Sequence, residues 1–211
     1  MTSHMNLNVT LSKTAALTPV ADQSGCTVQM CCPGWFDKRD TFSIANAPKF
    51  AANLRFSGDD LNFAARVLYA EASGSKVGYS IEELKAEKQA ILHVMYFRLN
   101  RKGYPSNNYI ATTFRMVGEA PKLQFESVAR AKPKFTACAI PDAEKLSRAE
   151  CADLQSCIQA VNEFVTKGPD FETYPFDEFR DVRSRPNWKA IAGNAFHLTN
   201  LGKSLLAGMK S

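Results

Sequence analysis

Three segments of this chain begin with a serine that is followed three positions later by an acid, and these signals constrain the fold most strongly. This spacing lets the serine and the acid each satisfy an open backbone N–H group in the first turn of a helix. A glycine follows each segment, as is typical of helix ends. The pairs Ser57/Asp60, Ser80/Glu83 and Ser147/Glu150 predict helices over about 57–72, 80–101 and 147–167, which stop near Gly74, Gly103 and Gly168.

Hydrophobic periodicity supports these helices and sets the first apart from the other two. Residues 80–101 and 147–167 carry apolar residues at helical spacing, as expected for amphipathic helices. Residues 61–72 are apolar on nearly every face, which is typical of a helix buried on most sides. We therefore expect a mainly α-helical protein of the α+β class, in which 57–72 forms the core helix and a small strand and loop region accompanies it.

The sequence divides at about residue 57. Residues 1–56 show no regular periodicity, and residues 1–4, Met-Thr-Ser-His, have the look of an expression-tag remnant. We predict an irregular N-terminal extension over 1–56 and one domain over 57–211. A chain of 211 residues is long enough for such a domain to bury a hydrophobic core.

Charge and hydropathy restrict the partner only loosely. The 26 basic and 21 acidic residues leave a net charge of +5, which suits an anionic partner or simply keeps the protein soluble. The basic residues are spread along the chain without a cluster, so we expect no nucleic acid as partner. No apolar run approaches the ~20 residues of a membrane-spanning helix, so we expect no membrane insertion.

Glu71 is the residue with the most unusual position. It stands at the end of the apolar helix, and Ala64, Val67 and Leu68 precede it at helical spacing on the same face. Burial and the partial negative charge of a helix C-terminus both disfavour a carboxylate there. One interpretation is an acid kept protonated near neutral pH, as a proton donor requires. The other is a side chain that bends to solvent or pairs with Arg66.

The sequence around Glu71 resembles a known signature. Residues 65–74 read Ala-Arg-Val-Leu-Tyr-Ala-Glu-Ala-Ser-Gly, similar to the motif A-R-V-[IL]-Y-A-E-A-x-G of the SleB-type, or spore-cortex-lytic, cell-wall hydrolases. Weaker matches follow in the family's order over about 61–198: Gln89-Ala90-Ile91, Asn100-Arg101, Tyr104-Pro105, Gln124-Phe125 and Gly193-Asn194-x-Phe196. The family usually carries a histidine after the last asparagine, whereas this chain has Ala195 there and His197 two positions later.

The resemblance implies a lysozyme-like fold in which Glu71 is the catalytic acid. The substrate it implies is the peptidoglycan glycan strand, cut between N-acetylmuramic acid and N-acetylglucosamine. Gln124 and Asn194 are candidates for binding the sugar, since an amide can donate to and accept from hydroxyl and acetamido groups, although each could instead cap a loop. Tyr69 and Phe125 could stack on sugar rings, although an aromatic ring beside a buried helix is more often part of the core.

The resemblance also implies the reaction of a lytic transglycosylase. In that reaction the muramic acid 6-hydroxyl attacks intramolecularly, so one carboxyl group serves as acid and then as base. The alternative is a hydrolytic muramidase, which needs a second carboxylate within about 10 Å of the acid. The candidates for it are Glu126, Asp177, Glu178 and Asp181, each of which we expect on the solvated surface.

Two further classes stay open beside the glycosidase. A cysteine peptidase or amidase acting on the wall peptide would pair Cys26, Cys31, Cys32 or Cys138 with His93 or His197, although none of these cysteines has a sequence context that activates a thiol. The other class is a module without activity that binds the wall or nucleic acid through its positive charge, although the basic residues form no cluster. The cysteine spacing does not fit a zinc site, so we expect neither a metal nor a cofactor.

The start of the chain raises the question of delivery. Residues 6–20 contain no continuous apolar core, so no signal peptide is visible. An enzyme that acts in the periplasm or cell wall would then use non-classical secretion, or delivery into a rival cell by a contact-dependent secretion machine. We therefore expect, besides peptidoglycan, a component of the secretion apparatus and an immunity protein as partners of an antibacterial effector.

Overall fold

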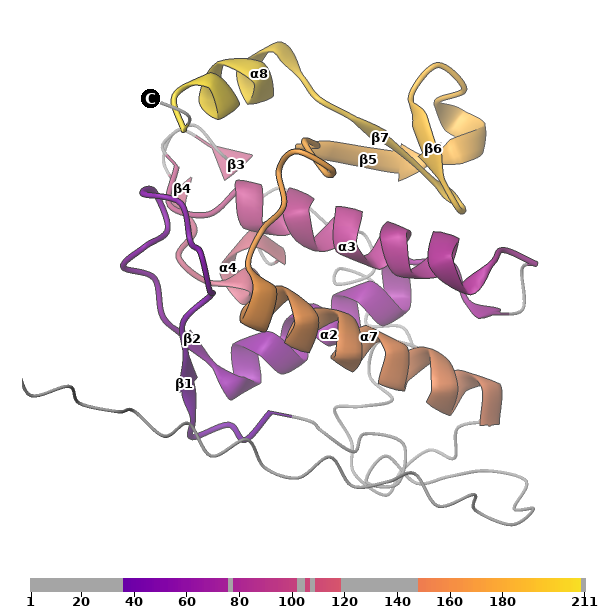
Figure 1. The fold of residues 1–211 in the computed structure, drawn as a ribbon, viewed down its shortest axis with the longest axis horizontal. Coiled ribbons are helices and arrows are strands. Elements are labelled where there is room, and N and C mark those ends of the chain that lie inside the picture. The colour runs from indigo at the N-terminus through magenta and orange to yellow at the C-terminus, as the bar shows by residue number, and fades with distance from the viewer. Residues whose placement is uncertain (1–35, 76–77, 102–104, 107–108, 119–147, 210–211) are drawn as a thin grey trace, which may run out of the picture.

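The computed structural model describes residues 36–75, 78–101, 105–106, 109–118 and 148–209, and it combines helices with small antiparallel sheets (Figure 1). The helices are α2 (Gly58–Glu71), α3 (Ile81–Phe97), α4 (Phe114–Gly118), α7 (Arg148–Lys167) and α8 (Asn200–Ala207). The strands are β1 (Thr41–Phe42), β2 (Phe56–Ser57), β3 (Pro105–Ser106), β4 (Tyr109–Ile110), β5 (Glu178–Asp181), β6 (Lys189–Ile191) and β7 (Asn194–His197). The predicted α+β class is confirmed.

The three predicted helices are confirmed as α2, α3 and α7. The Ser57 side chain accepts a hydrogen bond from the Asp60 N–H, and Ser80 and Glu83 form both halves of a capping box at α3. Gly168 ends α7 with φ +83°, a conformation that glycine adopts at little cost. A Cβ at that position would also collide with the Ala45 carbonyl oxygen.

Helix α2 forms the centre of the hydrophobic core. It packs on α7, α4 and α3, and its apolar residues from Leu61 to Leu68 are at most 1% exposed. Helix α3 and the two residues after it add an unbroken buried run from Ala90 to Leu99, with Tyr96 among the rings of Phe56, Phe114 and Phe164. The sequence predicted the buried nature of the first helix correctly.

The described part of the predicted N-terminal extension packs on the same core. Strand β1 pairs with β2, and Thr41 lies opposite Ser57, the residue that caps α2. Phe36 and Ile44 are 8% and 5% exposed and belong to the core cluster. Residues 36–56 therefore fold together with the helices, so the predicted boundary at residue 57 falls inside the β1–β2 pair. Residues 1–35 lie outside the described residues.

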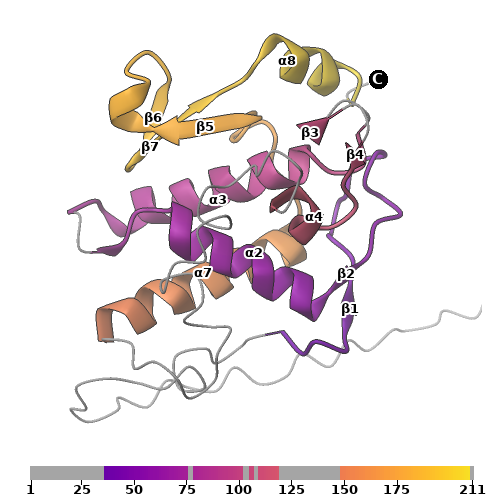
Figure 2. The ribbon, with the colours of Figure 1, turned by 180° about the vertical axis from the view of Figure 1, so that it is seen from behind.

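A three-stranded sheet lies across α3 from α2 and α7. Its order is β5-β7-β6, with all strands antiparallel, and both views of the ribbon place it with α8 on one side of α3 and the other two long helices on the opposite side (Figures 1 and 2). Phe196 of β7 is 1% exposed and faces the core. We predicted a small strand and loop region in general terms, and we did not predict α4 or α8.

Candidate functional site

Glu71 is the last residue of α2, and its side chain is partly exposed. Ala64, Val67 and Leu68, which share its face of the helix, are fully buried. The chain leaves the helix at once, because Ala72 is extended (φ −78°, ψ 157°) after its N–H donates to the Leu68 carbonyl oxygen. Glu71 therefore lies where the core helix reaches the surface, with more access to solvent than its neighbours led us to expect.

The residues directly after Glu71 are held by Glu87 of α3. One carboxylate oxygen of Glu87 accepts a hydrogen bond from the Ser73 backbone N–H at 2.6 Å, and the other accepts one from the Ser73 hydroxyl at 3.1 Å. Glu87 itself is 0% exposed. Burial raises the pKa of this carboxyl group, while the hydrogen bonds from Ser73 and Asn194 act in the opposite direction.

The turn between β6 and β7 completes this arrangement. The Gly193 backbone nitrogen lies 3.1 Å from both the Ser73 hydroxyl oxygen and Glu87 Oε1, and its N–H donates to both. The Asn194 side-chain amide donates to Glu87 Oε1 at 2.9 Å and to the Glu71 backbone carbonyl oxygen at 3.1 Å. A Cβ at residue 193 would collide with Ser73 Oγ, so glycine is required by this close approach. We call Ser73, Glu87, Gly193 and Asn194 the Glu87 network.

Asp153 of α7 holds the next part of the same loop. Its two carboxylate oxygens lie 3.1 and 3.2 Å from the Ser75 backbone nitrogen, whose N–H they share. A Cβ on Gly74 would lie 2.9 Å from Asp153 Oδ2, so the loop passes very close to α7. The backbone that follows Glu71 is thus attached to α3 at Ser73 and to α7 at Ser75.

Glu87 was overlooked in the sequence, although the rule that selected Glu71 applies to it. Leu84, Ile91 and Val94 lie three, four and seven positions away on α3, and all are buried. An acid on such a face needs buried partners, and this signal could have singled out Glu87. Its partners Ser73 and Gly193 carry no comparable signal, because only the fold brings them to it.

The structure describes two of the four predicted sugar-binding residues. Tyr69 is 6% exposed and belongs to the core, which leaves little ring surface for stacking on a sugar. Asn194 is 8% exposed, and its amide nitrogen donates inside the Glu87 network. Gln124 and Phe125 lie outside the described residues. Contact of these four residues with a sugar stays a prediction.

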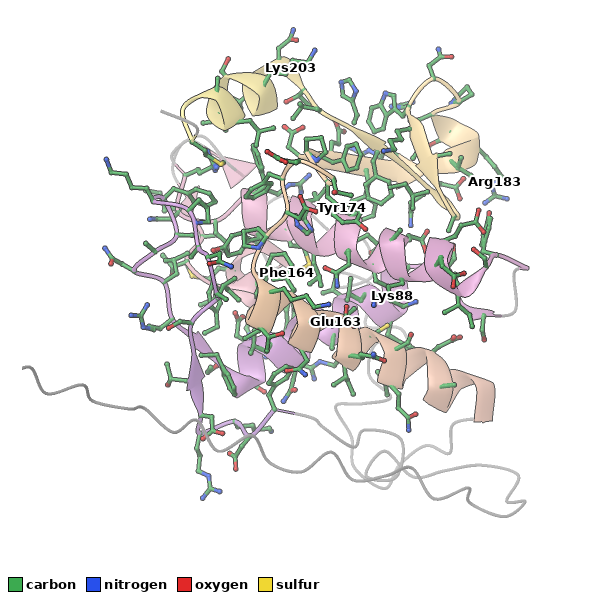
Figure 3. All side chains as sticks on the ribbon, in the orientation of Figure 1. Lys88, Glu163, Phe164, Tyr174, Arg183 and Lys203 are labelled. Carbon is green, nitrogen blue, oxygen red and sulfur yellow. The ribbon has the colours of Figure 1, made fainter. Side chains whose placement is uncertain are left out.

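Asp181 is the candidate second carboxylate that the sheet register brings to this end of the molecule. It lies opposite Asn194 in the β5–β7 pair. Its side chain is exposed, and the hydrogen bond from the Arg183 side chain lowers its pKa to about 2. Arg183 lies at the end of the sheet that is remote from α8 and its Lys203 (Figure 3). Asp181 is therefore ionised near neutral pH and paired with a cation.

The other candidate carboxylates have different surroundings. We expected Asp177 on the surface, and this was wrong: it is 0% exposed and accepts hydrogen bonds from the Thr199 N–H at 2.8 Å and the Thr199 hydroxyl at 2.6 Å. Glu178 is partly exposed and lies 3.3 Å from Arg180. Glu126 lies outside the described residues. Asp177 therefore holds the start of α8, a part that periodicity alone did not reveal.

The histidines of the thiol-enzyme alternative are both engaged. His93 is 2% exposed, its Nε2 accepts the Asp170 N–H at 2.7 Å, and its Nδ1 donates to the Gln89 carbonyl oxygen at 2.6 Å. His197 stacks on Trp188 with ring centroids 4.9 Å apart. His93 therefore has no ring nitrogen left for a thiol. The four cysteines proposed as its partners lie outside the described residues.

Two open depressions lie on another part of the surface. Their volumes are about 440 and 410 Å³, and they share Phe171, Glu172 and Leu206 in their walls, without Glu71. Their walls are formed mainly by apolar residues, with Asp170 and Glu172 as the acids, so they offer few polar groups for chemistry. In the described part of the chain, no group of three or more His, Cys, Asp or Glu residues is arranged to hold a metal ion.

No family model matches this chain, and no curated protein or solved structure matches it either. Among the described helices, none is long and apolar enough to cross a membrane.

Proposed function

We propose that this protein is a lysozyme-like enzyme that cleaves the glycan strand of peptidoglycan as a lytic transglycosylase, with Glu71 as general acid and base. The observation that carries the proposal is the hydrogen bond from the Asn194 amide to the Glu71 carbonyl oxygen at 3.1 Å, across 123 positions of sequence. The two segments that it joins are the first and the last of the motifs that resemble the SleB-type hydrolases. Motifs that match by chance have no reason to meet in space.

The exposure of the α2 end is a second support for the proposal. A proton donor must reach its substrate, and Glu71 is partly exposed while the helix before it is buried. The loop that follows is held by hydrogen bonds to Glu87 and Asp153, which keeps the end of the helix in place. A fixed acid on a rigid element suits a reaction that depends on orientation.

The proposed reaction proceeds through one carboxyl group. Glu71 gives its proton to the glycosidic oxygen as the bond from the muramic acid C1 to that oxygen breaks. The resulting carboxylate then takes the proton of the 6-hydroxyl group as the 6-oxygen bonds to C1. The products are a 1,6-anhydro-muramic acid end and a free 4-hydroxyl group on N-acetylglucosamine, and Glu71 returns to its acid form.

A hydrolytic muramidase is the second candidate, and Asp181 favours it. Its pKa near 2 keeps it ionised, as a stabilising or base carboxylate requires, and it lies opposite Asn194 in the sheet. Its hydrogen bonds with Arg183 count against it, since they occupy both carboxylate oxygens. A Cys/His peptidase has less support, because both ring nitrogens of His93 are used within the fold.

The glycosidase proposal is tested with Glu71→Gln on purified sacculi. The amide keeps the size of the side chain but has no proton to transfer, so the rate should fall by at least about 100-fold. Glu163→Gln is the matched control, because it alters a partly exposed acid on α7 that has no proposed part in the reaction, and it should cleave at the parent rate. Parent-rate cleavage by Glu71→Gln would refute the proposal.

Mass analysis of the products of the parent enzyme separates the candidate reactions. Anhydro-muropeptides are expected from a transglycosylase, reducing-end muropeptides from a muramidase, and cut stem peptides from a peptidase. Asp181→Asn should leave the yield of anhydro products unchanged. A strong loss of reducing-end products in that variant would favour the hydrolytic mechanism instead.

We further propose that the protein acts in the periplasm or cell wall as an antibacterial effector. Non-classical secretion or delivery into a rival cell would bring it there, with a secretion-apparatus component and an immunity protein as partners. Support for the site of action comes only from the substrate, because peptidoglycan lies outside the cytoplasmic membrane. Expression in the two compartments of a bacterium distinguishes this proposal from action in the cytoplasm.

A further inference from the structure

We propose that Glu87 is a positioning residue for Glu71, which it orients through Ser73 and Asn194. The inference rests on the proposed role of Glu71 as the acid, and it assigns to Glu87 no contact with the substrate. The Glu87 carboxylate touches the chain two residues after Glu71 and, through the Asn194 amide, the carbonyl group of Glu71 itself.

The geometry shows how these contacts set the direction in which the Glu71 side chain leaves the backbone. Glu71 is the last residue of α2, where intrahelical hydrogen bonds no longer hold the carbonyl groups. Its carbonyl oxygen receives the Asn194 amide instead, at 3.1 Å. The Ser73 N–H is held at 2.6 Å by Glu87. With the peptide plane and the following turn both held, the Cα–Cβ bond of Glu71 has a fixed direction.

A carboxylate is the group that this position requires. Three N–H donors converge on it: the backbone N–H groups of Ser73 and Gly193 and the side-chain amide of Asn194. The Ser73 hydroxyl also donates to it at 3.1 Å. A glutamine has one acceptor oxygen and one NH₂ group, so at least one of these donors would face another donor. In a fully buried place such a donor has no water as a substitute.

The network also joins three elements that the chain order keeps apart. Glu87 lies on α3, Ser73 follows α2, and Gly193 and Asn194 form the turn into β7. Asp60, at the opposite end of α2, offers a matched comparison: it is also a buried carboxylate, and it accepts the N–H groups of Phe114 and Arg115 at 2.9 and 2.8 Å. A general need for buried carboxylates would affect both residues equally.

The experiment compares Glu87→Gln with Asp60→Asn in initial rates on solubilised glycan strands. We expect Glu87→Gln to lower kcat by about 10- to 100-fold with KM within about twofold, because the acid is misdirected while the binding surface stays intact. Asp60→Asn should lose about as much thermal stability as Glu87→Gln loses, but it should keep the parent kcat. Parent kcat in Glu87→Gln, or an equal loss of kcat in Asp60→Asn, would overturn the inference.

Asn194→Ala provides a second measurement, which is needed if Glu87→Gln does not fold. It removes the amide that links Glu87 to the Glu71 carbonyl group. It should therefore lower kcat by a larger factor than it changes KM. Where both single variants fold, the double variant should lose no more kcat than the stronger single one, since both act on one path. A positioning role would be contradicted if the loss of kcat in the double variant equalled the product of the two single losses, or if Asn194→Ala kept the parent kcat.

Glu71→Gln separates a failure of this inference from a failure of the proposed function. If Glu71→Gln is inactive and Glu87→Gln has the parent kcat, only the positioning role is refuted. If Glu71→Gln cleaves at the parent rate, the proposed function fails first, and Glu87 has no acid to position.

Discussion

At the scale of single residues, His93 shows how burial fixes the chemistry of a side chain. Its ring lies among Phe164, Phe171 and Tyr174, two of which are labelled in Figure 3, and the acid Asp170 lies near it. Nε2 accepts a backbone N–H, so it cannot carry a proton without losing that hydrogen bond. Burial lowers the pKa of His93 to about 4. The residue is therefore neutral in the folded protein at physiological pH.

The lowered pKa of His93 predicts that the free energy of unfolding depends on pH. Because the folded pKa lies below the ordinary value of 6.5, its contribution is complete above pH 6.5 and is lost as the pH falls toward 4. Relative to His93→Gln, the parent should lose about 2 to 3 kcal/mol of unfolding free energy between pH 7 and pH 4.5. Urea unfolding at both pH values measures it, and a pH-independent difference would contradict it.

The comparison with His93→Gln is needed because two buried acids act in the opposite direction. Burial raises the pKa of Asp60 and of Glu87, so each contributes stability at low pH that is lost as the pH rises through its folded pKa. Both acids are present in parent and variant alike. Their contributions therefore cancel in the difference, and the part due to His93 remains.

At the scale of elements, several helix ends are held by acids from other segments of the chain, of which Asp60 and Asp177 are buried and Asp153 is partly exposed. Asp60 of α2 accepts the first N–H groups of α4, and Asp153 of α7 holds the loop after α2. Asp177 receives the N–H and hydroxyl of Thr199, the N-cap of α8. These contacts link the start of α4, the loop after α2 and the start of α8 to other segments, so local capping and tertiary packing stabilise the same places.

Thr199 is the element-scale test of this linkage. Thr199→Ala removes the cap of the Gly202 N–H at 3.0 Å and the hydroxyl that donates to the buried Asp177 at 2.6 Å. We expect a loss of about 1 to 3 kcal/mol of unfolding free energy, because a cap and a buried acceptor are both affected. Thr199→Ser should retain most of the stability in the same denaturant titration. Equal losses in the two variants would show that the hydroxyl contributes little.

At the scale of the whole molecule, the candidate site is the place where three parts of the fold converge. The end of α2, the first half of α3 and the β6–β7 turn meet at Glu87, with α3 between the sheet and the other long helices (Figure 1). Glu71 lies at the edge of this junction. A substitution that perturbs any of these three parts should therefore also change the position of Glu71, the proposed acid.

The whole molecule also permits a test of where it acts. Fused to a signal peptide and expressed in a bacterium, the parent protein should be toxic, because it then meets peptidoglycan in the periplasm. The same protein in the cytoplasm should be harmless, and Glu71→Gln should be harmless in both compartments. Colony counts measure the effect, and equal harmlessness of the parent in both places would count against an antibacterial role.

The sequence by itself determined the three long helices and the burial of α2. Their signals are local: a serine and an acid three positions apart, or an apolar residue every third or fourth position, act within one or two turns. Glu71 also stood out locally, as an acid after an apolar run. Helix α8 was missed because its cap, Thr199, has no acid three positions later and depends on Asp177 from another segment.

Only the tertiary structure decided how the site is assembled. Ser73 meets Glu87 across 14 positions, Gly193 meets Glu87 across 106, and Asn194 meets Glu71 across 123. Hydrogen bonds over such separations leave no periodic trace in a sequence, because they depend on how packed elements bring distant backbones together. The acid at the end of α2 was visible from its neighbours in the sequence, whereas the Glu87 network depends on the packing that brings α2, α3 and the β6–β7 turn together.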